Sequence, residues 1–201
     1  MKLYVSLTSP FARKVRIGLA EKGLAQRIEQ IVVDPWNDDG TLTATNPLSQ
    51  VPALQLDDGL ALTDSDTILG WLDRAFPQPP LWPHDPQART HAEAIAALAQ
   101  TLLEYTVFLV LEDRRPPAMR SAPMIERRTQ SLMRGIEALN SRFHASTVHF
   151  HLDSIGVACA LGYLDFRQPE LDWRRHAPKL ATWMEWAAQR PSVRDTAPPP
   201  A

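Results

Sequence analysis

The sequence has 201 residues, of which 44% are hydrophobic and 22% charged, a composition typical of a globular protein with one or two packed domains. Lys and Arg (21) nearly balance Asp and Glu (23), giving a formal net charge of -2. This balance does not favour nucleic acid or an anionic membrane as the principal partner, so small-molecule chemistry is the expected function class.

The cysteine content limits the redox and metal chemistry. The chain has one cysteine, Cys159, which excludes an intrachain disulfide framework, a CxxC pair and a thiolate zinc site. Its neighbours in 155–161 are small and apolar, so we expect a buried packing residue. The first residues contain neither a long apolar stretch nor a cleavage site, and we therefore expect a cytoplasmic protein.

The first 33 residues predict a strand, a helix and a second strand. Apolar residues alternate over residues 3–7, as in a half-buried strand. Ser9 followed by Pro10 is a typical helix start, and Gly23 is a typical helix end. Residues 28–33 are β-branched enough for a second strand. Because a helix connects the two strands, they should be parallel.

The next segments complete a first domain. Residues 34–46 have turn chemistry and predict an irregular loop or a weak helix. Residues 51–56 and 60–62 predict an antiparallel hairpin, since Asp57-Asp58-Gly59 between them favours a tight turn. A helix should follow Ser65, because Ile68, Leu69, Leu72 and Phe76 share one face. The expected fold class is α/β with a mixed four-stranded sheet.

A proline-rich stretch marks the expected domain boundary, since five prolines in residues 77–86 are too many for a helix or a central strand. We expect a first domain over 1–77, a linker over 78–86 and an all-helical bundle over 87–201. Apolar stripes at helical spacing support the bundle. They comprise Ile95, Leu98, Leu102, Tyr105 and Leu109, and then Ile125, Leu132, Ile136, Leu139 and Phe143.

Ser9 is the first candidate for chemistry. Ser9-Pro10-Phe11-Ala12 occupies the strand-to-helix turn where thioredoxin-like folds carry a Cys-Pro-aromatic-Cys pair, so disulfide exchange is not available here. A hydroxyl at a helix N-terminus suits a bound thiolate, because backbone N–H groups and the helix dipole favour an anion there. The alternative is that Ser9 only caps the helix.

Two further segments have polar groups suited to a peptide ligand. A cis Pro52 would present the Val51 backbone N–H and C=O to an extended ligand, whereas a trans proline at a strand start is the commoner event. At the next helix start, the Ser65 hydroxyl can hold a carboxylate while Asp64 attracts an ammonium group. Here too the alternative is a simple helix cap.

The order and spacing of these segments resemble the glutathione S-transferase superfamily. The resemblance is carried by 9–16 (SPFARKVR), 46–54 (NPLSQVPAL), 62–68 (LTDSDTI) and the last helix from Pro178 into Arg194. Residues 158–167 (ACALGYLDFR) are also similar to a small group of bacterial members whose active-site hydroxyl is a serine. The resemblance covers nearly the whole chain and implies a thioredoxin-like domain followed by a helical domain.

The resemblance also implies a site. Ser9 would hydrogen-bond the glutathione sulfur, Val51 with Pro52 would bind the cysteinyl backbone, Gln50 would reach the peptide, and Asp64 with Ser65 would hold the γ-glutamyl end. Glutathione would be the co-substrate, with no metal. The partner would be a small hydrophobic electrophile, in a pocket between the domains lined by Phe11, Tyr105 and Phe108. Members are usually homodimers, which we expect here.

Two positions depart from the family pattern. Ser49 stands where many members have glycine, which alters the loop if positive φ is needed. His151 and Ser154 occupy the positions where many members have a Ser/Thr-x-x-Asp capping box, so that helix start must be satisfied differently, with Asp153 as a candidate.

Other functions remain open on sequence grounds. One is a glutathione-binding scaffold or regulatory protein without turnover, because fold does not fix function. Another is a glutathione-dependent peroxidase. Nucleic-acid binding is disfavoured because no basic stripe with interleaved aromatics occurs. His149 and His151 alternate as in a surface strand or loop and are poor evidence for a metal.

Overall fold

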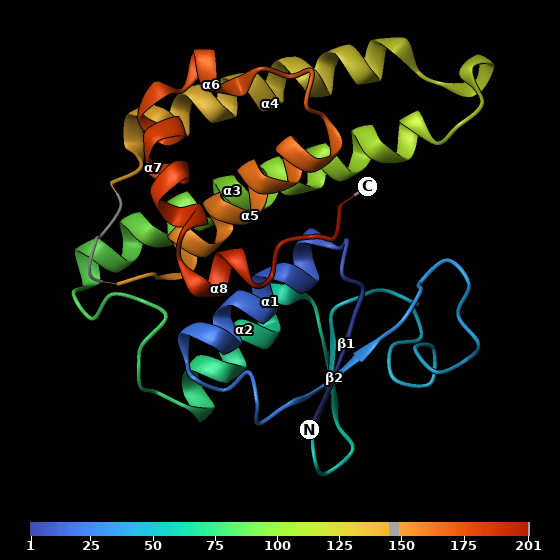
Figure 1. Ribbon diagram of the computed structural model, residues 1–201, viewed down its shortest axis with the longest axis vertical. Helices are drawn as coiled ribbons and strands as arrows, with labels where there is room; N and C mark the ends of the chain where they lie inside the picture. Colours follow the sequence, from blue (N-terminus) through green and yellow to red (C-terminus); the bar gives the residue numbers. More distant parts are fainter. Residues whose placement is uncertain (145–148, 201) are drawn as a thin grey trace. The chain divides into compact units, whose positions relative to one another are not determined.

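The computed structural model describes residues 1–144 and 149–200, and its backbone separates into two compact units. The first consists of Met1–Leu81 together with the segment that begins at Pro191, and the second is Trp82–Arg190 (Figure 1). The division falls within the proline-rich stretch 78–86.

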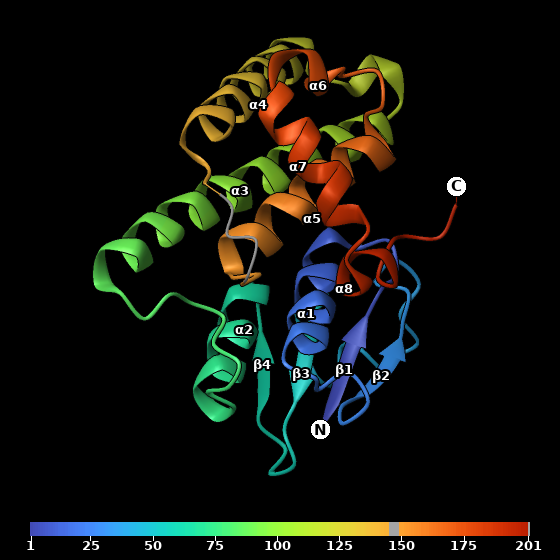
Figure 2. The same ribbon diagram turned by 60° about the vertical axis from the view of Figure 1, so that its left-hand side comes forward.

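A four-stranded mixed sheet forms the first unit, in the order β2-β1-β3-β4. β1 (Lys2–Val5) is parallel to β2 (Glu29–Val32) and antiparallel to β3 (Ala53–Gln55), which pairs antiparallel with β4 (Ala61–Thr63). Helices α1 (Pro10–Glu21) and α2 (Ser65–Ala75) lie on one face of this sheet (Figure 2). The predicted fold class, a mixed sheet with helices, is confirmed.

Both faces of the central strand β1 are covered. Leu3 and Val5 share one face and are fully buried, while Tyr4 on the other face packs in a cluster with Leu42 and Ala53. Leu42 belongs to the irregular segment 34–46, which consists of turns. This loop therefore closes the core on the second face.

Helices α1 and α2 approach closely at Gly18. A Cβ atom at this position would overlap the Leu69 side chain of α2, so glycine is required by packing and not by its backbone conformation. Gly23, just beyond the end of α1, has a φ of 67°, which confirms its predicted role in ending the helix.

Helices make up the second unit. The long helices are α3 (Pro86–Asp113), α4 (Ala122–Arg142) and α5 (Leu152–Arg167), followed by α6 (Trp173–His176) and α7 (Pro178–Ala188), with a 3-10 turn, η1 (Pro117–Met119), between α3 and α4. α5 is the most buried of them and includes Cys159, which is fully buried as predicted.

Helix α3 is long and apolar enough, by length and composition alone, to cross a membrane. It packs against both α4 and α5. Its inward residues Ile95, Ala99, Leu102 and Leu103 are buried in these contacts. The buried face of α3, 39% of its apolar window, therefore belongs to the core of the second unit.

The C-terminal segment differs from the sequence-based division, which assigns 191–201 to the helical domain. α8 (Pro191–Arg194) groups instead with the first unit. The Arg13 guanidinium of α1 donates to the Val193 carbonyl (3.0 Å), and that of Arg16 donates to the Thr196 carbonyl (3.3 Å). The physical reason is that Arg13 is 7% exposed, and a buried guanidinium needs acceptors.

Candidate functional site

The sheet register brings the three predicted binding segments to one edge of the first unit. Tyr4 of β1 lies opposite Ala53 of β3, and Ala53 lies opposite Thr63 of β4. Because both pairs are antiparallel, the residues that follow β1, precede β3 and follow β4 all emerge at this edge. Ser9, the segment 50–52 and Asp64 lie in these three connections, and Ser65 is the first residue of α2.

Ser9 is the N-cap of α1, and its hydroxyl oxygen accepts one hydrogen bond. The Ala12 N–H donates to Ser9 Oγ (3.2 Å), and the Arg13 N–H donates to the Ser9 carbonyl (3.0 Å). The capping role is therefore present. A hydroxyl that accepts a hydrogen bond can still donate its proton, so Ser9 can cap the helix and donate to a bound sulfur together.

The segment before β3 is held by a buried asparagine. Asn46 Nδ2 donates to the Gln50 carbonyl (2.8 Å), and Asn46 Oδ1 accepts from the Leu48 N–H (3.1 Å). The Val51–Pro52 peptide bond is cis, a point that the sequence leaves open. Val51 lies just outside the register of β3 with its neighbours. Asn46 thereby fixes the backbone on which Gln50 and Val51 lie.

Ser49 stands where many family members have glycine, and its backbone shows whether the loop needs a positive φ at this position. Its φ is 50°, in the left-handed region that favours glycine. Its hydroxyl donates to the Pro35 carbonyl (3.4 Å). The loop therefore keeps a left-handed residue at this position although a serine occupies it.

Asp64 and Ser65 have different roles at the start of α2. Asp64, with a φ of 71°, is the N-cap, and its Oδ1 accepts from the N–H groups of Asp66 (2.9 Å) and Thr67 (3.0 Å). Ser65 is 1% exposed, and its Oγ has no hydrogen-bond partner among the described residues. A buried hydroxyl without a partner is costly, so this atom is the clearest unsatisfied group at the edge.

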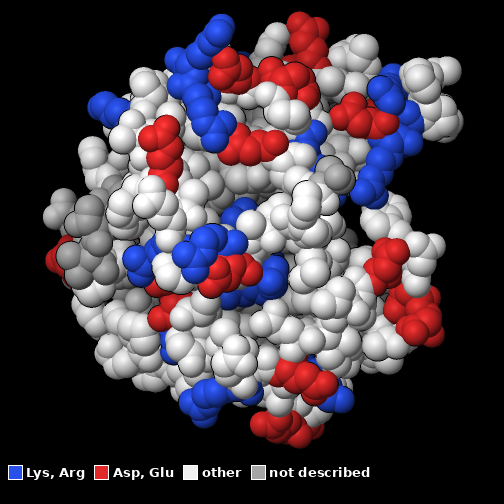
Figure 3. Space-filling view, in the orientation of Figure 1, with Lys and Arg blue, Asp and Glu red and all other residues white. Residues whose placement is uncertain are grey.

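The helix that Ser9 caps, α1, carries several basic side chains. Lys14 is buried, and its ammonium pairs with Asp66 Oδ1 (2.6 Å), which links α1 to the first turn of α2. Burial lowers the pKa of Arg16, and the nearby charge of Arg13 lowers it further. On the face seen in Figure 3, basic and acidic side chains are interspersed.

The aromatic residues proposed for the electrophile side lie on α3. Tyr105 and Phe108 are half-buried, and the guanidinium carbon of Arg128, from α4, lies 4.3 Å from the Tyr105 ring centre and 5.6 Å from that of Phe108. The position of Arg128 over these rings is not predicted by the sequence. No sequence signal could have found it, because its position depends on how α3 and α4 pack.

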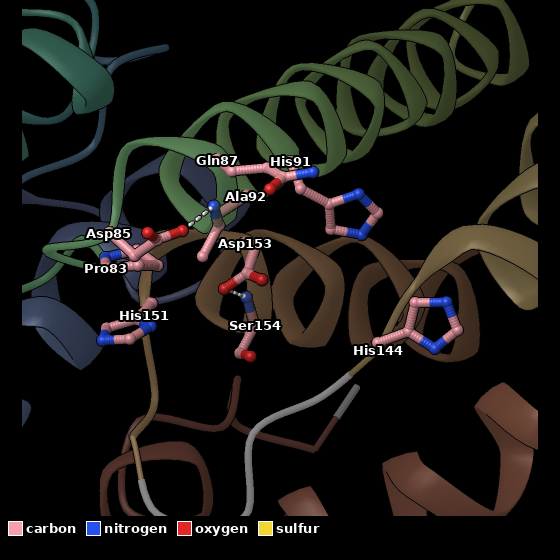
Figure 4. Close-up of a pocket in the computed structure, with 10 residues that line it drawn as sticks. Pro83, Asp85, Gln87, His91, Ala92, His144, His151, Asp153 and Ser154 are labelled. Carbon is pink, nitrogen blue, oxygen red and sulfur yellow. Dashed lines mark hydrogen bonds between the residues drawn. The ribbon is translucent and has the colours of Figure 1, made fainter.

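A cavity of about 570 Å³ lies among residues of the helical unit, and no sequence pattern predicts it. Figure 4 shows the buried Asp153 at the start of α5, where its Oδ1 accepts from the Ser154 N–H (2.7 Å). Asp153 thus satisfies one N–H group of a helix start whose N-cap residue, His151, makes no side-chain capping hydrogen bond. Burial raises the pKa of Asp153. The lining residues are Pro83, Asp85, Gln87, Ala88, His91, Ala92, His144, His151, Asp153 and Ser154.

The histidines do not form a metal site in the described structure. The rings of His149 and His151 stack with centres 5.3 Å apart. Within residues 1–144 and 149–200, no group of three or more His, Cys, Asp or Glu side chains is arranged to hold a metal ion.

A thioredoxin-like sheet followed by a helical unit, with the three predicted segments at one edge of the sheet, is the arrangement of glutathione-transferase-like proteins. The model of the glutathione S-transferase N-terminal domain matches residues 8–75, and that of the C-terminal domain matches residues 122–185. Together these matches cover more than half of the chain. The chain belongs to the glutathione S-transferase superfamily.

Individual relatives agree with this assignment. An uncharacterized GST-like protein, YibF, of Escherichia coli K12 is 33% identical over 204 residues and covers 100% of both chains. A stringent starvation protein A homolog of Coxiella burnetii is 28% identical over 171 residues, which is 85% of this chain and 77% of that protein.

A solved structure extends the comparison. A glutathione transferase family member from Pseudomonas fluorescens Pf-5, with bound glutathione, is 37% identical with a TM-score of 0.92 and covers 98% of each chain. A family member from the same organism with bound S-(propanoic acid)-glutathione is 36% identical, with a TM-score of 0.89, over 99% of this chain and 100% of that chain.

Proposed function

We propose that this protein is a cytoplasmic glutathione transferase that binds glutathione at the sheet edge and adds its sulfur to a small electrophile. The observation that carries the proposal is the unpartnered Ser65 hydroxyl, buried at a helix start directly after the capping Asp64. A carboxylate accepts hydrogen bonds from such a group. The γ-glutamyl end of glutathione has both a carboxylate for Ser65 and an ammonium group for Asp64.

The rest of the peptide follows the sheet edge. The backbone of Val51 would pair with the cysteinyl residue as a neighbouring strand does, with Gln50 beside it and Pro52 leading into β3. This placement directs the thiol toward Ser9 at the start of α1. The glutathione bound in the Pseudomonas fluorescens structure supports glutathione as the ligand.

The proposed reaction needs only a stabilised thiolate. A free thiol has a pKa of roughly 8.5, and donation from Ser9 together with the α1 N-terminus lowers it. The thiolate electron pair then forms a bond to an electrophilic carbon, which expels a leaving group or passes the electrons to a conjugated carbonyl that takes a proton from water. The thioether in the second Pseudomonas fluorescens complex is the kind of product this step gives.

A regulatory glutathione-binding protein is the second candidate. It is favoured by the similarity to the Coxiella burnetii homolog, whose name refers to starvation and not to transfer. Both candidates require the glutathione site, and only the first requires turnover. By family resemblance we also propose a homodimer for either candidate.

Calorimetric titration with glutathione tests the site. Ser65→Ala should weaken binding about tenfold or more, since a hydrogen bond to a charged group contributes about 1.5–3 kcal/mol. Lack of binding by the wild-type protein would contradict both candidates.

Turnover separates the two candidates. Ser9→Ala should slow thiol addition to 1-chloro-2,4-dinitrobenzene by about 10- to 100-fold, while glutathione affinity stays nearly constant. Ser9→Thr keeps a hydroxyl and is the matched control. An unchanged rate in Ser9→Ala would remove Ser9 from the catalytic role, and a wild-type protein inactive on an electrophile panel would favour the regulatory candidate.

A further inference from the structure

The cavity of the helical unit contains a buried carboxylate that is not paired with a cationic side chain. Asp153 is 9% exposed, and among the described residues its hydrogen bonds come from its neighbour Ser154 alone. His151 is near its charge, but no Lys or Arg of the described chain forms an ion pair with it. A buried carboxylate is costly unless a cation or several donors compensate it. Asp153 can therefore accept from a further donor in the cavity (Figure 4).

The rest of the lining adds negative charge and apolar surface. Asp85 contributes a second carboxylate, which accepts from the Ala88 N–H (2.8 Å). Among the described lining residues there is no Lys or Arg, whereas Pro83, Ala88 and Ala92 present apolar atoms. This combination suits a ligand with a positive charge and an apolar body.

His91 of α3 supplies a neutral acceptor to the same cavity. Its Nε2 lies 3.0 Å from the Arg142 carbonyl, and its ring stacks on that of His144 with centres 5.9 Å apart. A carbonyl can only accept, so Nε2 carries the proton, and Nδ1 of the neutral ring is then an acceptor. An ammonium group, which has three donors and no acceptor, matches His91 Nδ1 and the Asp153 carboxylate.

The size of the cavity and the arrangement of its side chains favour an organic cation over a metal ion. Within residues 1–144 and 149–200, no group of three or more His, Cys, Asp or Glu side chains is arranged to hold a metal. The volume of about 570 Å³ lies in the range of small-molecule pockets.

We propose that this cavity binds a small organic amine, with its ammonium group on Asp153 and its apolar body against Pro83 and the alanines of α3. All described lining residues belong to the helical unit. The amine site is therefore separate from the proposed glutathione site at the sheet edge and does not rest on it. Asp153 supplies the counter-charge, and His91 Nδ1 supplies a second acceptor.

Matched amines and alcohols isolate the charge. Benzylamine is compared with benzyl alcohol, and tryptamine with tryptophol, by calorimetric titration of the full chain at neutral pH. Each pair differs by an ammonium and a hydroxyl of nearly equal size, and the two pairs test a smaller and a larger apolar body. At least one amine should bind about tenfold more tightly than its alcohol, because hydrogen bonds between charged groups are stronger than neutral ones.

Substitutions assign the preference to Asp153. Asp153→Asn keeps the size of the side chain and removes its charge, so the preference for the amine should fall to less than about twofold. Asp153→Glu keeps the charge on a longer side chain and should retain part of the preference. Glu93→Gln removes the same charge from an exposed position of α3 outside the lining and should retain all of it. Thermal unfolding of each variant checks that the fold is intact.

Each outcome supports or overturns the inference. A preference that persists in saturating glutathione and disappears in Asp153→Asn supports it. Equal affinity for amine and alcohol in both pairs overturns it, and so does an equal loss in Glu93→Gln, because a general charge effect would then suffice. Displacement of the amine by glutathione also overturns it, because the ammonium would then lie at Asp64. A protein that binds the amine through Asp153 but binds no glutathione would lose the proposed function and keep this site.

Discussion

Two cations, one in each unit, differ in how the surrounding residues meet their charge. Lys22 in the first unit has a fully buried side chain, and its ammonium donates to Asp73 Oδ1 (2.8 Å) and to the carbonyls of Phe76 (2.7 Å) and Pro79 (2.8 Å). Arg128 in the helical unit has aromatic faces but no acceptor among the described residues. A satisfied charge holds the fold together, whereas an unsatisfied one is suited to a ligand.

The largest expected change in stability comes from replacing Lys22, whose charge has acceptors in the protein. Lys22→Met removes the ammonium that donates to the Asp73 carboxylate and to two carbonyls, and leaves Asp73 with only the Leu81 N–H (2.8 Å) as a donor among the described residues. It should therefore lower the free energy of unfolding by about 3–5 kcal/mol. Chemical denaturation measures the loss. Lys2→Met, at an exposed position of the same unit, is the control and should change stability by less than about 0.5 kcal/mol. Equal effects of the two substitutions would contradict the structural role of Lys22.

The same comparison applies at the start of α2, with a smaller effect. Asp64→Ala removes the cap of two N–H groups and should cost about 1 kcal/mol of stability. Ser65→Ala removes a buried hydroxyl that has no partner and should leave stability unchanged or slightly raised. Thermal unfolding without ligand distinguishes them. A clear loss of stability in Ser65→Ala would mean that the hydroxyl serves the fold and is not held for glutathione.

Asp153 is a buried acidic group with one hydrogen bond from a backbone N–H. Its replacement should have the smallest effect on stability of the changes considered. Burial raises the pKa of its carboxyl in the folded state, although the Ser154 N–H opposes this. The folded protein therefore binds the proton more tightly than the unfolded chain, and the cost of the charged form is greatest at neutral pH. Relative to Asp153→Asn, the wild-type protein should gain stability as pH falls from 7 through the folded-state pKa. Urea unfolding of both proteins at several pH values measures the trend, and a difference that does not vary with pH would contradict it.

Local sequence signals predicted much of the first unit. Ser9 before Pro10, Gly23 at the helix end and the Asp57-Asp58-Gly59 turn are short-range patterns, and they produce the expected elements. The sequence could not predict that Asp64 caps the helix while the Ser65 hydroxyl has no partner among the described residues. Both residue types are good helix caps. The outcome depends on the left-handed φ of Asp64, which places its carboxylate, and not the Ser65 hydroxyl, over the helix N–H groups.

Contacts between residues far apart in the sequence could not be predicted, because they depend on tertiary packing. Arg128 lies 20 residues or more from the rings that hold it, and Arg13 finds its acceptor at Val193. Neither contact leaves a local pattern, since an arginine on a helix is most often a solvated charge. The cavity bounded by Asp153 likewise depends on two helices that are distant in the sequence.

The return of the C-terminal segment to α1 has a consequence for synthesis of the chain. The first unit contains residues from both ends of the sequence, with the helical unit between them. The contacts of Arg13 with Val193 and of Arg16 with Thr196 can form only after the ribosome has made the whole helical unit and the segment that follows it. Although the first unit is begun first, it is completed after the helical unit has been made, and the helix that starts at Ser9 has an exposed flank until then.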